Sequence, residues 1–144
     1  MTDKETYARL CLQEPSVPLF MQPWWLDAAC GPKPWDVLLS RDATGRVIGA
    51  MPYLWGVKWG MKYVLVPQQT QICGLWMPAD VMRDNITLSG VCADMKRQLD
   101  DLHLAYYYQH YPLESRAPEV MQQMGFTIRE RITYRIDRKS TRLN

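Results

Sequence analysis

Hydrophobic residues recur every three or four positions over residues 84–102, which predicts one long amphipathic helix. Asp84 and Asn85 are both suitable N-cap residues for this helix. Its apolar stripe consists of Leu88, Val91, Cys92, Met95, Leu99 and Leu102. A shorter helix is predicted over residues 22–30, because Pro23 suits the first helical position and Gly31 ends the helix.

Four runs rich in branched apolar or aromatic residues predict strands, at residues 36–41, 46–54, 62–66 and 104–111. The sequence Asp-Ala-Thr-Gly between the first two runs is typical of the turn in an antiparallel hairpin. Pro52 predicts a bulge or a strand edge at its position, because proline has no N–H group to offer a neighbouring strand.

The last part of the chain contains a third helix and a strand. The helix is predicted over residues 118–124, with Pro118 at its start and a Gly125-Phe126 pair placed for a Schellman-type end. Residues 126–136 alternate between apolar and polar positions, which predicts an antiparallel strand with one face on the core. The elements together predict an α/β (α+β) architecture, a mixed and mostly antiparallel sheet flanked by helices.

The composition fits one globular domain and excludes several classes of protein. The chain has 144 residues, of which 47% are hydrophobic and 22% charged, enough for a core of its own. The net charge is +2, but three basic residues lie in 138–144, and without them acidic residues outnumber basic ones. Nucleic acid is therefore not an expected partner. The four cysteines lack metal-ligand spacing and no apolar stretch has the length of a membrane span, so we expect no metal, free thiols and a cytoplasmic location.

Several segments of the sequence resemble FemAB-like proteins of the GNAT acyltransferase superfamily. They are PLFMQPWWLDA at residues 18–28, TQICGLW at 70–76, Met-Gly-Phe at 124–126 and TYRI at 133–136. The resemblance covers residues 15–137 and corresponds to the N-terminal half of such proteins. We therefore expect one GNAT-like domain over residues 1–137, followed by a foreign-looking basic tail over residues 138–144.

The resemblance implies an acyl- or aminoacyl-transferase in which two GNAT-like halves share one chain. The missing C-terminal half would be the partner of this one, which would bind an amine acceptor, a small molecule or a peptide, and be inactive alone. We expect no cofactor on this half, and an acyl-CoA or aminoacyl donor in the complete parent protein. Two alternatives stay open: a small stand-alone acetyl-CoA-dependent N-acetyltransferase, and a non-catalytic binding module with the same fold.

Candidate site residues come from two polar clusters and one isolated carboxylate. The expected substrate-binding residues are Gln68, Thr70, Gln71, Trp76, Tyr106, Tyr108 and His110. The last three share one face of a strand, where they either line a cleft or pack into the core. Glu130 and His110 are the candidate proton carriers for catalysis. The other possibility for Glu130, which stands on an otherwise apolar strand face, is a buried ion pair with an arginine.

Residues 71–76 are the nearest match to the loop that binds the pyrophosphate of acetyl-CoA in GNAT proteins. In such a loop, small residues let the phosphates approach backbone N–H groups at the start of a helix. Trp76 replaces the last small residue, and several residues separate the segment from the next helix. The alternative is a strand end that contains Gly74 and is capped by an aromatic ring. Cys73 is expected to be a buried, unreactive thiol.

Overall fold

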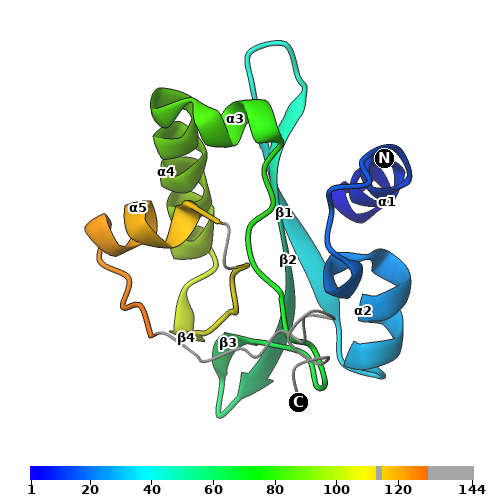
Figure 1. The fold of residues 1–144 in the computed structure, drawn as a ribbon. Coiled ribbons are helices and arrows are strands. Elements are labelled where there is room, and N and C mark those ends of the chain that lie inside the picture. The colour runs from blue at the N-terminus through cyan, green and yellow to red at the C-terminus, as the bar shows by residue number, and fades with distance from the viewer. Residues whose placement is uncertain (113–114, 130–144) are drawn as a thin grey trace, which may run out of the picture.

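A four-stranded sheet forms the centre of the molecule in the computed structural model, which describes residues 1–112 and 115–129 (Figure 1). The strands are β1 (Trp35–Arg41), β2 (Val47–Lys58), β3 (Met61–Leu65) and β4 (Leu104–Tyr107), and they lie in that order across the sheet. The pairs β1–β2 and β2–β3 are antiparallel, whereas β3 and β4 are parallel. The predicted mixed, mostly antiparallel sheet is confirmed.

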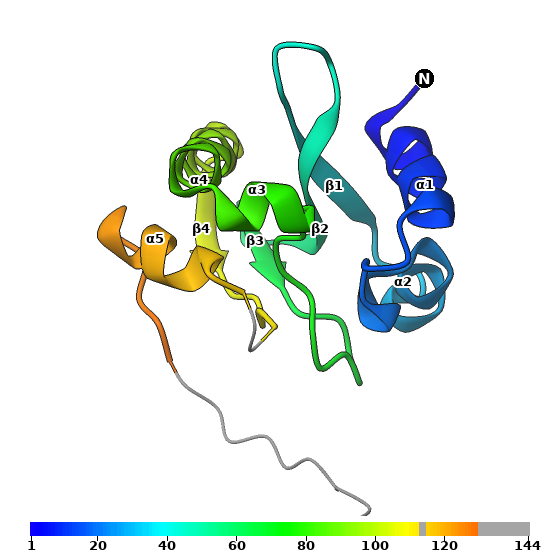
Figure 2. The same cartoon turned by 45° about the horizontal axis from the view of Figure 1, so that its top comes forward.

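Helices cover both faces of the sheet (Figures 1 and 2). One face carries α1 (Asp3–Gln13), the short 3-10 helix η1 (Leu19–Met21) and α2 (Pro23–Cys30). The other face carries α3 (Ala79–Arg83), α4 (Asn85–Asp101) and α5 (Ala117–Gln123). Because neighbouring residues of a strand point to opposite faces, Val37 and Leu39 pack on the side of α1 and α2, while Leu38 packs on the side of α4.

The elements with strong local signals form as predicted. Helix α2 has a proline at its start and ends at Gly31, whose φ of +58° suits glycine. The side chain of Asp84 caps α4 by accepting a hydrogen bond from the N–H of Ile86, and the predicted apolar stripe is buried except at its end, Leu102. The predicted Schellman end of α5 is confirmed, since the N–H of Phe126 donates to the carbonyl of Met121 at 3.2 Å.

Helix α1 was not predicted. Its start is marked by a capping box, in which the side chains of Thr2 and Glu5 each accept a hydrogen bond from the other's backbone N–H group. Tyr7 is the fully buried residue of the helix, and its hydroxyl donates to the carbonyl of Met21 at 2.5 Å. One buried residue in eleven leaves no apolar stripe for a periodicity argument to detect.

Two predicted strands differ from the structure. The strand expected over 104–111 ends at Tyr107, and further along His110 pairs antiparallel with Cys73 instead of with β3. Of the strand expected over 126–136, residues 126–129 belong to no strand, and the rest lies outside the described residues together with Glu130 and the tail 138–144.

At Pro52, strand β2 pairs with β1 but not with β3. Its pairing with Val37 of β1 continues without a bulge, whereas pairing with β3 begins two residues later, at Leu54. The alternative of a local edge is therefore the one that the structure supports. On that open side the carbonyl of Pro52 accepts a hydrogen bond from the side chain of Gln109 at 2.8 Å.

Candidate functional site

After β3, the chain loops out of the sheet and then returns to pair with β2 again. Residues of β3 pair with β2 as far as Leu65, and the pairing resumes at Trp76, which exchanges two backbone hydrogen bonds with Ala50 at 2.8 and 2.9 Å. Between them the chain leaves the sheet over residues 66–72, called here the excursion. The excursion turns at Gln69, whose φ of +56° lies in the left-handed region.

An open depression of about 880 Å³ lies beside the excursion. One wall comes from the end of β3 and the excursion, and the other comes from the segment after β4. Its lining residues are Leu65, Val66, Pro67, Gln69, Thr70, Gln71, Tyr108 and His110. Among the described residues, the lining contains no carboxylate, lysine or arginine, so it suits a ligand held by uncharged hydrogen bonds and ring contacts.

Tyr106, Tyr108 and His110 form a continuous row of rings, as the period of two predicts. The rings of Tyr106 and Tyr108 are stacked with centroids 6.4 Å apart, and the Tyr108 ring meets the His110 ring edge-on at 5.0 Å. His110 Nε2 lies 3.0 Å from the Tyr108 hydroxyl, within hydrogen-bond distance. Because Tyr106 is 54% exposed and the other two line the depression, the row faces a surface and not the core.

The backbone on both sides of the depression is held in place. The N–H and carbonyl groups of His110 bond to those of Cys73 at 3.1 and 2.9 Å, which fixes the chain beneath the imidazole. Thr70 is buried and its hydroxyl accepts a hydrogen bond from Trp25 Nε1 at 3.0 Å, so the excursion is attached to α2. Trp25 packs on Phe20, whereas its neighbour Trp24 is 59% exposed.

Most of the predicted substrate-binding residues lie together, and two do not. Thr70, Gln71, Tyr108 and His110 line the depression and Tyr106 adjoins it through the ring row. Gln68 is exposed and lies outside the lining. Gln69, which belongs to the same predicted cluster of uncharged polar residues after Pro67, also lines the depression, and its φ lies in the left-handed region.

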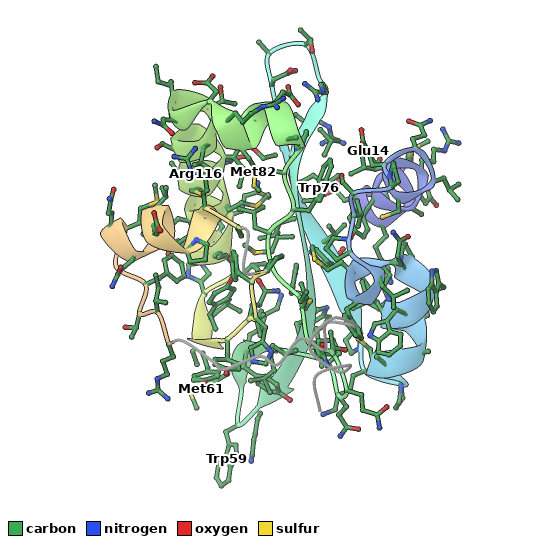
Figure 3. All side chains as sticks on the ribbon, in the orientation of Figure 1. Glu14, Trp59, Met61, Trp76, Met82 and Arg116 are labelled. Carbon is green, nitrogen blue, oxygen red and sulfur yellow. The ribbon has the colours of Figure 1, made fainter. Side chains whose placement is uncertain are left out.

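Trp76 was wrongly grouped with these residues. Its side chain is 5% exposed and packs in the cluster between the sheet and α1 (Figure 3). Its indole N–H donates to the hydroxyl of Ser16 at 3.1 Å. Because its ring is buried and its N–H group is bonded within the protein, Trp76 belongs to the core.

The second part of the segment 71–76, from Cys73 to Trp76, is buried chain that pairs with other segments at both ends, which does not resemble a phosphate loop. The backbone N–H groups of Cys73 and Trp76 are used by His110 and Ala50, and Gly74 lies directly against the ring of Tyr111. Cys73 is fully buried, and burial raises the pKa of its thiol to about 12, which makes it a poor nucleophile. The expectation of an unreactive thiol is consistent with this environment.

No group of three or more His, Cys, Asp or Glu side chains gathers into a metal site in residues 1–112 and 115–129. Over the same part of the chain, none of the helices has both the length and the apolar character needed to cross a bilayer.

Comparisons with solved structures identify the fold. No protein-family model and no curated protein matches the sequence. The structure of a ribosomal-protein-alanine N-acetyltransferase from Brucella melitensis biovar Abortus 2308 matches with a TM-score of 0.51 and 11% identity, over 94% of this chain and 93% of that chain. An aminoglycoside antibiotic 6'-N-acetyltransferase from Acinetobacter baumannii matches with a TM-score of 0.47 and 13% identity, over 95% and 94%. With its sheet topology, the match to the first structure shows that this chain has the GNAT fold.

Proposed function

We propose that this chain is the acceptor-binding, N-terminal half of a GNAT-fold acyl- or aminoacyl-transferase. In this proposal the depression beside the excursion receives a small molecule or peptide that carries the acceptor amine. The observation that carries the proposal is the uncharged lining of the depression, with two glutamines on one wall and the Tyr108–His110 pair on the other.

The lining chemistry matches the needs of an amine acceptor. Glutamine side chains can donate to a carbonyl and accept from an N–H group, which suits amide recognition, and tyrosine rings offer flat contact surfaces. An amine must be neutral to attack a carbonyl carbon, and a wall without carboxylates does not favour its charged form. In this proposal the pair of His110 and Tyr108 accepts the proton that the nitrogen loses as the new N–C bond forms and the bond between the acyl carbon and its donor breaks, so that the acyl group leaves the donor.

Donor binding is assigned to another part of the parent protein. In the described chain, residues 71–76 offer buried backbone whose Cys73 and Trp76 N–H groups are already bonded. The next long helix, α4, begins with the carboxylate of Asp84 on its first N–H groups, and a negative charge there opposes a phosphate. Both features support a donor site outside these elements.

A stand-alone acetyl-CoA-dependent N-acetyltransferase is the second candidate. It is supported by the extent of the structural match, since this chain aligns with 93% of the ribosomal-protein-alanine N-acetyltransferase from Brucella. In that case the donor would have to bind beside the same depression, within one domain.

Thermal stabilisation by ligands distinguishes the two candidates. The purified chain is heated with acetyl-CoA, with a longer acyl-CoA, and with short peptides that carry a free amine. A ligand that binds only the folded chain raises Tm by several degrees when its concentration is about 100 times Kd. Stabilisation by peptide and not by CoA compounds is expected, whereas stabilisation by acetyl-CoA would favour the stand-alone enzyme.

Matched variants locate the site. Gln71→Ala and Tyr108→Phe should weaken the peptide-induced shift, because both residues line the depression. Gln68→Ala is the control, since Gln68 is a neighbouring but exposed glutamine outside the lining. The proposal fails if no amine-bearing ligand stabilises the chain, or if Gln68→Ala weakens the shift as much as Gln71→Ala. Tight peptide binding by a complete parent protein without any transfer would indicate a binding module.

A further inference from the structure

The hairpin that joins β2 to β3 has an unusual residue in its turn. Lys58 pairs with Met61, so the loop consists of Trp59 and Gly60, with φ of +60° and +75°. Left-handed φ at both positions is the type I′ turn, for which Asn-Gly is the preferred sequence. A bulky side chain such as that of Trp59 is disfavoured in this conformation. The strained tryptophan therefore points to a role other than shaping the turn.

Large apolar side chains around this turn are exposed to solvent. Trp59 is 86% exposed, and Val57 and Met61 are 60% and 55% exposed. Figure 3 shows Trp59 pointing away from the body of the molecule at the end of the hairpin, with Met61 next to it. Residues 57–62 are called the hairpin tip below. Its apolar groups contribute nothing to the core that the structure describes.

The charges on the hairpin tip are all positive. Lys58 is exposed, and Lys62 holds its ammonium group 4.7 Å from the centre of the Trp55 ring. No Asp or Glu occurs anywhere in residues 53–66. Lys58 and Lys62 belong to opposite strands of the hairpin and lie on its opposite faces, because the partner of Lys62 is Val57. A cation therefore stands on each side of the apolar end.

We propose that the hairpin tip is an anchor for the surface of an anionic lipid bilayer. Trp59, at the end of the tip, would enter most deeply, to the boundary between headgroups and hydrocarbon where its amphipathic ring is favoured, and Val57 and Met61 would lie behind it among the headgroups. Lys58 and Lys62 would bind the anionic headgroups while their apolar stems stay against the tip. The attachment is peripheral, because the tip comprises one turn and its flanking residues.

A bilayer fits this tip better than a protein partner does. Stable protein interfaces bury about 800 Å² on each partner and are depleted in lysine, whereas this tip is a narrow projection that carries two lysines. A bilayer surface requires no matching shape. It also offers apolar depth and negative charge at the same place, as the residues of the tip require.

Vesicle sedimentation tests the proposal with the full chain. Vesicles of phosphatidylcholine with phosphatidylglycerol should bind the protein, and vesicles of phosphatidylcholine alone should bind it at least about tenfold more weakly. Trp59→Asn should weaken binding to the anionic vesicles by about tenfold or more, because a large buried side chain is lost. Ile86→Ala is the control, since Ile86 is an 84% exposed apolar residue on α4 and its removal should leave binding unchanged.

The stability of Trp59→Asn separates the anchor from a structural role. Because Asn-Gly is the preferred pair for this turn, the variant should keep or raise Tm while it loses vesicle binding. The double variant Lys58→Glu and Lys62→Glu should also lose binding. Its control is the double variant Lys33→Glu and Arg83→Glu, which makes the same charge change at exposed sites elsewhere.

The outcomes that overturn the proposal are distinct. Failure to bind anionic vesicles, or equal binding by the unmodified chain and Trp59→Asn, excludes the anchor. Self-association that Trp59→Asn abolishes, in a protein that ignores vesicles, would assign the tip to a protein interface. The proposal does not depend on acyl transfer, because peptide binding in the depression and vesicle binding at the tip are separate measurements.

Discussion

At the scale of single residues, a chain of partly buried hydrogen bonds connects the end of β4 and the segment after it to β2. The hydroxyl of Tyr107 lies 2.7 Å from Gln109 Oε1 and 2.8 Å from the hydroxyl of Tyr111, and Gln109 Nε2 donates to the carbonyl of Pro52. Burial raises the pKa of both tyrosines well above the ordinary value, so both stay protonated donors. In residues 1–112 and 115–129, no buried side-chain nitrogen or oxygen lacks a partner.

Gln109→Leu should destabilise the chain by about 2–3 kcal/mol, because it removes an acceptor from the Tyr107 hydroxyl and a donor from the Pro52 carbonyl. Gln68→Leu is the matched control and should change stability by less than about 0.5 kcal/mol, since Gln68 is exposed. Urea unfolding of the two variants checks the difference. Equal free energies of unfolding for the two variants would mean that the Gln109 amide contributes nothing to stability.

The sequence predicted the candidate site in part. The strand period of two placed Tyr106, Tyr108 and His110 on one face, and the run of uncharged residues after Pro67 marked the excursion. Trp76 was misassigned because its partner, Ser16, lies 60 positions away in the sequence. The same run could not show which of its glutamines line the depression, because the left-handed φ at Gln69 is required by no residue type there.

At the scale of elements, α4 packs tightly against the sheet at a glycine of β2. A Cβ atom added to Gly49 of β2 would lie 2.6 Å from Cγ1 of Val91 on α4. Valine is stiff at χ1, so its methyl group cannot easily move aside. Gly90, the preceding residue of the same helix, points to open space, with nothing within 4 Å of an added Cβ.

Replacing these two glycines by alanine should have opposite effects. Gly49→Ala should cost about 1–3 kcal/mol through overpacking between β2 and α4. Gly90→Ala should stabilise the chain by about 0.5–1 kcal/mol, because alanine favours the helix and meets no neighbour. Thermal unfolding of both variants gives the comparison, and a loss of stability in Gly90→Ala would contradict the described packing of α4.

Elements were predictable where local sequence decides them. Helix α4, helix α2 and the β1–β2 hairpin carry periodic apolar residues together with caps or turn residues. The early end of β4 and the excursion depend instead on pairings between distant segments, such as Cys73 with His110 and Ala50 with Trp76. A residue pattern within one segment contains no information on such partners, so these features could not be predicted.

At the scale of the whole molecule, helices lie on both faces of one sheet (Figure 2), and each face carries its own hydrophobic cluster. One is centred on residues such as Tyr7 and Leu26, and the other on residues such as Met51 and Leu88. Both clusters include side chains of β1 and β2, because successive residues of these strands point to opposite faces. Neither cluster can lose these strands without exposing the other.

Urea unfolding should therefore show one transition for the whole chain, with far-UV and near-UV circular dichroism in agreement. Leu26→Ala, a fully buried residue of α2, should shift this transition by about 2–5 kcal/mol for both probes. An earlier, separate transition in the near-UV signal would show instead that α1 and α2 unfold independently of the sheet.

The excursion lines the depression but takes no part in the strand pairing of the sheet. It lies between Leu65 and Cys73, and the chain is held on both sides of it: the carbonyl of Val64 accepts a hydrogen bond from the N–H of Tyr108, and Cys73 pairs with His110. Closing a longer loop between fixed ends adds little entropic cost, so residues 66–72 can change in length and sequence while the sheet keeps its register. Replacing this one loop can therefore reshape the wall of the depression and leave the scaffold unchanged.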